Sequence, residues 1–180
     1  MSDNKTNKNV INMKKQIVYD FVKSINNHDV DRIYELMNDD FRFIDAYGNV
    51  ETGKDHMKES WMGYFRWFPD YEIEIIDIVS DGDTFVILGF ASGTYQNIKS
   101  ANNENYWRLP AAWRVVVLEN KIKGWQVYCD SKIPFDIVFP YISTGHLRVF
   151  YGKGSQIQQS YHSQHLGHLH SDAKVNMDTY

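Results

Sequence analysis

The stretch from residue 26 to residue 45, NNHDVDRIYELMNDDFRFID, decides the fold, because a helical pattern passes directly into a strand pattern within it. Asp29 is a residue type that caps helix N-termini, and apolar residues follow it at helical spacing. These residues are Val30, Ile33, Leu36 and Met37. After Asp39 and Asp40, the run 41–44 is typical of a short strand. We therefore expect a short helix followed at once by a strand that ends at Asp45.

A longer helix is predicted before this stretch, over residues 13–27. Asn12 is a candidate N-cap, and one apolar stripe runs along the segment. The stripe consists of Met13, Ile17, Val18, Phe21, Val22 and Ile25. Asn27 and His28 end the pattern, so the two helices are expected to form a compact hairpin.

A third helix is predicted after a turn around Gly48 and Asn49. Thr52 and Asp55 fit a capping pattern, and Pro69 stops the helical spacing. The apolar positions between them are Met57, Trp61, Tyr64, Phe65 and Phe68. A helix with so many rings is expected to pack against a large apolar surface.

From Tyr71 the apolar period changes to two, which indicates strands. The doublet Ile75 and Ile76 suggests a bulge or burial on both faces, and Asp81-Gly82 predicts a hairpin. The further strands are expected at about 84–95, 106–118 and 122–131, the last two joined by Glu119, Asn120 and Lys121. Gly89 and Gly93 allow the sheet to bend strongly. We therefore predict an α+β fold, with a bent antiparallel sheet wrapped as a cone around helices and an internal apolar pocket.

The overall composition is that of one globular domain. The 180 residues are 43% apolar and 15% aromatic, which favours a pocket for flat apolar ligands, although ring packing without a ligand explains it equally well. A net charge of −4 without a basic block argues against nucleic acid and membrane partners. The predicted organisation is a disordered N-terminus over 1–9, a domain over 10–137 and a polar, His-rich tail over 138–180. With one cysteine and a polar start, a cytoplasmic location is expected.

Three stretches in the right order resemble the SnoaL-like branch of the nuclear transport factor 2 superfamily, which has a ketosteroid isomerase-like cone fold. The stretch quoted above resembles that superfamily's "G-D-x-x-x-I-x-x-L-x-x-D-D" pattern followed by a strand ending in Asp. The others are DAYGNVETGKDHMKESW, residues 45–61, and LPAAWRVVVLENKIKGWQVYCD, residues 109–130. The resemblance implies a homodimer that forms through the convex face of the sheet.

Asp45 occupies the place of the acid/base of ketosteroid isomerases, which moves a proton between substrate carbons. The resemblance implies that their oxyanion tyrosine is replaced by Phe21, its supporting tyrosines by Met37 and Trp61, and their protonated Asp by Ala112. Loss of such donors makes true ketosteroid isomerase activity improbable. Polyketide cyclases of the SnoaL type resemble this arrangement better, because they use one Asp on activated substrates.

The candidate catalytic residues are Asp45 and Asp130. A carboxylate at the wall of an apolar pocket suits a general base, but Asp45 could equally cap the turn at Tyr47-Gly48. Asp130, near the pocket mouth by resemblance, could instead bind nearby backbone or Lys132. The candidate substrate-binding residues are Phe21, Trp61, Phe65, Trp113 and Tyr128. Trp61 is the preferred substitute donor, because a buried indole N–H needs an acceptor.

The first function hypothesis is proton transfer, of isomerase or cyclase type, on an apolar cyclic or polyketide-like ketone, with Asp45 as the base and no cofactor. The second is a non-catalytic domain that binds a small apolar ligand or mediates dimerisation. An epoxide hydrolase would need a relay such as Asp45, Arg108 and Asp130. A metal site is not expected, and His162, His165 and His168 in the tail are only a weak metal-binding pattern.

Overall fold

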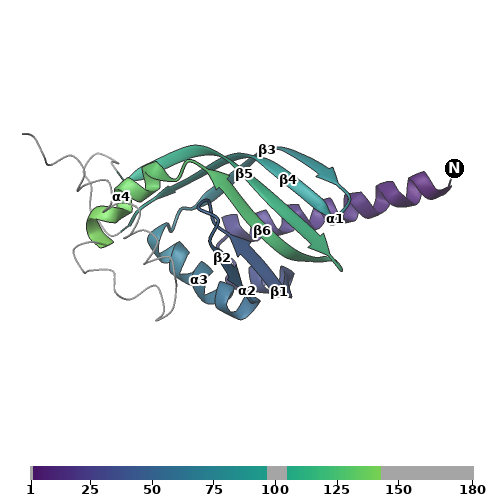
Figure 1. The fold of residues 1–180 in the computed structure, drawn as a ribbon, viewed down its shortest axis with the longest axis horizontal. Coiled ribbons are helices and arrows are strands. Elements are labelled where there is room, and N and C mark those ends of the chain that lie inside the picture. The colour runs from purple at the N-terminus through teal and green to yellow at the C-terminus, as the bar shows by residue number, and fades with distance from the viewer. Residues whose placement is uncertain (1, 97–104, 143–180) are drawn as a thin grey trace, which may run out of the picture. The chain divides into compact units, whose positions relative to one another are not determined.

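The computed structural model describes residues 2–96 and 105–142, and this part of the chain forms four helices and one six-stranded sheet (Figure 1). The helices are α1 (Ser2–Asn26), α2 (Val30–Leu36), α3 (Lys54–Trp67) and α4 (Lys132–Ile142). The strands are β1 (Met37–Ile44), β2 (Val50–Thr52), β3 (Glu72–Asp81), β4 (Thr84–Thr94), β5 (Tyr106–Leu118) and β6 (Lys121–Cys129). The α+β prediction is confirmed. Residues 1–140 and 141–180 form two separate units, and the histidines of the predicted tail lie outside the described residues.

The sheet has the strand order β2-β1-β6-β5-β4-β3. Strands β3 to β6 form the predicted antiparallel meander, and β1 pairs antiparallel with β2. However, β1 lies parallel to β6, with Phe43 opposite Trp125, so the sheet is mixed rather than wholly antiparallel. This pair brings the end of β1, and hence Asp45, beside the end of β6.

The sheet bends at a bulge between β3 and β4. The register shifts between Ile75 and Asp77, as the Ile75-Ile76 doublet suggested. Gly89 lies opposite Ile75, and a Cβ atom there would be 1.9 Å from the backbone oxygen of Glu74. Only glycine lets the two backbones approach this closely. The neighbouring hairpin turns at Gly82, whose φ is 56°.

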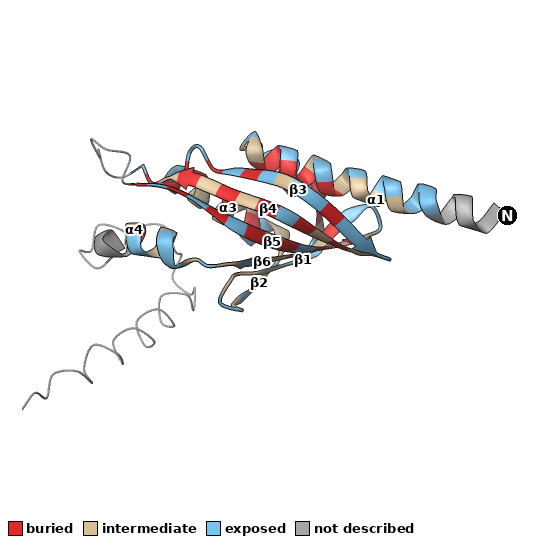
Figure 2. Ribbon diagram, turned by 90° about the horizontal axis from the view of Figure 1, so that it is seen from above, coloured by how far each residue is buried: buried red, intermediate tan, exposed pale blue. Residues whose placement is uncertain are grey.

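Burial alternates along the long strands, so one face of the sheet holds the core (Figure 2). On β5 the inward side chains are Trp107, Leu109, Ala111, Trp113, Val115 and Val117. Helix α1 packs on β3, β5 and β6, while α3 packs on β1 and β2. The Asn26 side-chain amide fixes α1 to β3, because it donates to the oxygen and accepts from the nitrogen of Ile73, both at 2.9 Å.

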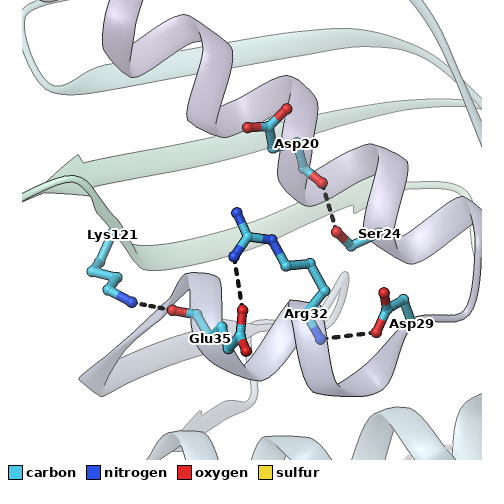
Figure 3. A network of polar contacts seen from close by, with 6 residues as sticks. All are labelled: Asp20, Ser24, Asp29, Arg32, Glu35 and Lys121. Atoms are coloured by element: carbon cyan, nitrogen blue, oxygen red, sulfur yellow. Dashed lines mark hydrogen bonds and ion pairs between the residues drawn. The ribbon is translucent and has the colours of Figure 1, made fainter.

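Figure 3 shows polar contacts within α1, within α2 and its N-cap, and between α2 and Lys121. The chain turns at His28, whose φ is 53°, and Asp29 caps α2 by accepting from the backbone nitrogen of Arg32 at 2.9 Å. The Arg32 guanidinium binds Glu35 at 2.7 Å, and the Lys121 ammonium donates to the Glu35 backbone oxygen. These contacts connect the hairpin to the start of β6.

Three local expectations differ from the structure. Helix α1 begins at Ser2 rather than at residue 13, and its N-terminal half projects beyond the sheet (Figures 1 and 2). Helix α3 has Gly53 as its N-cap, with no side-chain cap, and Asp55 instead accepts from the Tyr34 hydroxyl at 2.8 Å. Helix α4 was not predicted. Within the described residues, no helix is long and apolar enough to cross a membrane.

Candidate functional site

Five rings from α3, from the segment between α3 and β3, and from β5 pack together at one end of the core. We call them the aromatic cluster: Trp61, Tyr64, Phe68, Tyr71 and Trp107. Tyr64 is central, because its ring centroid lies 6.1 Å from Trp61, 5.1 Å from Phe68 and 5.0 Å from Tyr71. Trp107 lies 5.5 Å from Phe68 and 6.1 Å from Tyr71. The cluster joins the helical layer to the sheet.

Two indole groups of this cluster lack a hydrogen-bond acceptor among the described residues. The residues Trp61 and Trp107 are only 7% and 5% exposed, and no acceptor binds either Nε1 atom. Trp113 lies deeper in the core and is fully buried, and its Nε1 atom also lacks an acceptor among the described residues. Because a buried donor without an acceptor is costly, each of these groups could serve an acceptor oxygen of a ligand.

Tyr71 and Cys129 connect the aromatic cluster to the end of β6. Tyr71 is 7% exposed, and burial raises the pKa of its phenol far above the ordinary value, with a smaller contribution from Cys129. Burial also raises the pKa of the Cys129 thiol, and the negative charges of Asp130 and Asp45 raise this pKa further by smaller amounts. The two carboxylates therefore lie near the thiol, and the thiol lies near the phenol.

Asp45 uses both carboxylate oxygens in the turn after β1. Its Oδ1 accepts from the backbone nitrogens of Tyr47 and Asn49, each at 2.9 Å. Its Oδ2 accepts only from the side-chain amide of Asn49, at 2.8 Å. The capping role considered from the sequence is thus present, and Oδ2 is the oxygen that backbone groups leave available.

Asp130 and Tyr128 are placed differently from Asp45. Asp130 is exposed just beyond β6, and its Oδ1 accepts from the backbone nitrogen of Lys132 at 3.0 Å. Tyr128 is 51% exposed on the outer face, opposite Ala112 of β5. On β5, Ala111 faces the core opposite Cys129, whereas Ala112 does not. The core position that corresponds to the protonated Asp of ketosteroid isomerases is therefore Ala111, one residue before the predicted Ala112. Either position is an alanine, so the absence of a second acid there is unchanged.

The other predicted site residues divide between two groups of rings. Phe21 and Trp113 both pack on Trp125 in the deep core, with centroids 5.1 Å and 6.3 Å away. Phe65 stacks on Trp61 at 5.3 Å and on the imidazole of His28 at 4.2 Å. Trp61 therefore belongs to the aromatic cluster and Phe65 borders it, whereas Phe21 and Trp113 lie in the other group.

The structure does not assemble the relay that an epoxide hydrolase would need. Arg108 lies on the outer face of β5, where its guanidinium binds Glu74 at 2.6 Å and lies 3.6 Å above the Phe90 ring. Arg108 is thus on the face opposite to Cys129, the residue near Asp45, which faces the core side opposite buried Ala111. No group of three or more His, Cys, Asp or Glu residues that could hold a metal occurs in residues 2–96 and 105–142.

Sequence reasoning missed Tyr71, Trp107 and Cys129 as site residues. The alternation from Tyr71 placed its side chain with Ile73 on one face, which was a usable signal. Nothing in the local pattern indicated that this ring would approach Cys129, since the strands β3 and β6 are separated by two others.

The comparisons with known proteins agree with this fold. The SnoaL-like domain model matches residues 18–125, so the chain belongs to the SnoaL-like domain family. No curated protein matches the sequence.

Solved structures with the same fold share little sequence with the chain. An LEH-like epoxide hydrolase from M. tuberculosis has a TM-score of 0.60 and 14% identity, covering 74% of this chain and 94% of its own. A proposed SnoaL-like polyketide cyclase from Shewanella denitrificans OS-217 has a TM-score of 0.60 and 13% identity, with coverage of 71% and 97%. A protein with a ketosteroid isomerase-like fold from Catenulispora acidiphila, in complex with trimethylamine, has a TM-score of 0.55 and 17% identity, covering 62% of this chain and 83% of its own. At these identities the likeness concerns the fold alone.

Proposed function

We propose that this SnoaL-like domain binds a small, largely apolar ring compound that carries an acceptor oxygen, such as a cyclic or polyketide-like ketone. The observation that carries the proposal is the buried indole N–H of Trp61, which has no acceptor among the described residues. Trp61 is part of the aromatic cluster and stacks on Phe65, so a flat ligand there would contact rings and receive one hydrogen bond.

A matched pair of ligands tests this proposal. 1-Tetralone has a fused ring and a ketone, whereas tetralin has the same ring system without the oxygen. We expect Trp61→Phe, which keeps a ring but removes the N–H, to weaken 1-tetralone binding by about threefold to tenfold, the range for one neutral hydrogen bond. Tetralin affinity should change much less. Equal losses for both compounds would mean that Trp61 contributes ring contact only.

A second candidate function is proton transfer with Asp45 as the acid/base, as the first hypothesis from the sequence stated. It is favoured by Oδ2, which accepts a single hydrogen bond from a side-chain amide that can rotate away. The carboxylate would accept a proton from the carbon next to the ketone, leaving an enolate whose oxygen the indole N–H stabilises.

Deuterium uptake at C2 of 1-tetralone in D2O measures this step directly by NMR. Asp45→Asn keeps the shape and the acceptor oxygen for the turn, and we expect it to slow exchange by about a hundredfold or more. Tetralone affinity of the same variant should remain within about twofold. Equal exchange rates in the two proteins would reject Asp45 as the base while leaving the binding proposal intact.

The domain is also proposed to form a homodimer through the outer face of the sheet. Exposed apolar side chains there include Leu88 of β4, at 44%, and Tyr128 of β6, which lie on either side of Ala112 of β5. An exposed apolar sheet face is typical of a contact surface. We expect a dimer in sedimentation velocity and dissociation of the dimer in Leu88→Glu, while a monomeric wild type would contradict this proposal.

A further inference from the structure

Tyr71 is held by two backbone contacts and by contacts of its ring with two other rings. Its backbone nitrogen donates to the Phe68 backbone oxygen at 3.1 Å, and its backbone oxygen lies 3.1 Å from Nε2 of His28. Its ring meets Tyr64 edge-on, with an interplanar angle of 84°, and lies 6.1 Å from Trp107. These contacts fix where the hydroxyl can point, because the ring has little room to turn.

The hydroxyl of Tyr71 is a neutral donor in the interior. Burial raises the pKa of the phenol, so it keeps its proton at any physiological pH. Among the described residues, no hydrogen bond of this hydroxyl is found. A phenol in a buried residue normally has a partner, so this hydroxyl has donor capacity that a ligand could use. The buried indole nitrogens of Trp61 and Trp107 are further donors without an acceptor among the described residues.

The position of Tyr71 relates this donor to the candidate base. Its phenol interacts electrostatically with the Cys129 thiol, which in turn interacts with the charges of Asp45 and Asp130. Cys129 and Asp45 lie at the ends of neighbouring parallel strands. A ligand between Tyr71 and the end of β1 would thus meet a donor and a carboxylate on the same side of the core.

We propose that Tyr71 donates a hydrogen bond to the keto oxygen of the ligand and so replaces, from the position just before β3, the oxyanion tyrosine that α1 lacks at Phe21. This inference rests on the proposed function and deepens it. It assigns the ligand an oxygen that accepts two neutral donors, Tyr71 and Trp61, as a ketone oxygen with two lone pairs can. Tyr71 is then a substrate-binding residue.

The test uses 1-tetralone labelled with ¹³C at the ketone and the variant Tyr71→Phe, which removes only the hydroxyl. Two quantities are measured: the dissociation constant and the infrared stretching frequency of the bound carbonyl, which falls when the oxygen accepts a hydrogen bond. We expect about threefold to tenfold weaker binding in Tyr71→Phe and a carbonyl frequency shifted toward the unbonded value. Tyr106→Phe, a tyrosine exposed on the outer face of β5, is the matched control and should change neither quantity.

The outcomes separate the two proposals. If wild-type protein binds 1-tetralone and Tyr71→Phe leaves the carbonyl frequency unchanged, the Tyr71 inference is overturned and the proposed function stands. A loss of affinity without a frequency change also overturns it, because that result indicates a packing effect. If the wild type binds no ring ketone, the proposed function fails, and the role of Tyr71 fails with it. Melting temperatures of each variant show whether the fold is intact.

Discussion

Gly89 provides the sharpest test of how the sheet is bent around the core. In the variant Gly89→Ala, the new Cβ would lie 1.9 Å from the Glu74 backbone oxygen and 3.0 Å from its carbonyl carbon. Atoms this close must separate by more than 1 Å, roughly the gap to an ordinary contact, and both atoms met are backbone. The bulge therefore has to shift or open. We expect a loss of about 3 kcal/mol in the free energy of unfolding, at the upper end for overpacking.

Gly93→Ala is the matched control, because Gly93 is also buried in β4. A Cβ there would be 3.3 Å from the Phe68 Cβ and 3.5 Å from the Trp107 side chain, so small side-chain movements suffice. Its expected cost is below about 1 kcal/mol. Urea unfolding followed by tryptophan fluorescence and circular dichroism measures both variants. If Gly89→Ala is destabilised no more than Gly93→Ala, the close backbone approach does not explain the glycine.

Three further predictions concern other parts of the fold. The rate of Cys129 alkylation by iodoacetamide should have its pH midpoint above the usual thiol value of about 8.5, and Asp130→Asn should lower that midpoint because it removes a negative charge that raises the thiol pKa. Glu119→Asn should stabilise the β5–β6 turn by about 0.5 kcal/mol in urea unfolding, because φ is 50° there and asparagine tolerates this region. Asn26→Ala should lower the free energy of unfolding by about 2 kcal/mol, because two backbone groups of β3 lose their partner. Asn27→Ala, at an exposed position, should lower it by less than about 0.5 kcal/mol. Equal losses in the two variants would contradict this prediction.

Local patterns predicted the elements better than their pairing. The doublet at Ile75 and the dipeptide Asp81-Gly82 each indicate a specific backbone geometry, and the structure has a bulge and a hairpin there. The parallel pairing of β1 with β6 has no local signal, because it joins segments about eighty residues apart. The start of α1 was missed because residues 2–12 lack an apolar stripe that tertiary packing would require.

The candidate site was predictable in its residue types but not in their convergence. Strand alternation requires Tyr128 and Cys129 to lie on opposite faces, but it does not say which face is the core. The identity of Asp45 came from a resemblance, while its three hydrogen bonds depend on the exact turn that Asn49 closes. Tyr71 is the clearest omission, because it precedes β3 whereas Cys129 ends β6, and no sequence spacing relates the two residues.

The donors of the described interior favour some ligands over others. Its buried polar side chains include the Trp61 indole and the Tyr71 phenol, and the buried polar residues Ser24 and Asn105 are uncharged. A ligand carboxylate would lose its hydration there without a described cation to replace it. We therefore expect a ring keto ester to bind at least about tenfold more tightly than the corresponding keto acid at pH 7. Donors at one oxygen stabilise an enolate whose charge is concentrated on that oxygen more than an enolate whose charge is shared between two oxygens. A 1,3-dicarbonyl compound should therefore exchange deuterium faster than 1-tetralone by a smaller factor on the protein than in buffer. Equal factors on the protein and in buffer would contradict this expectation.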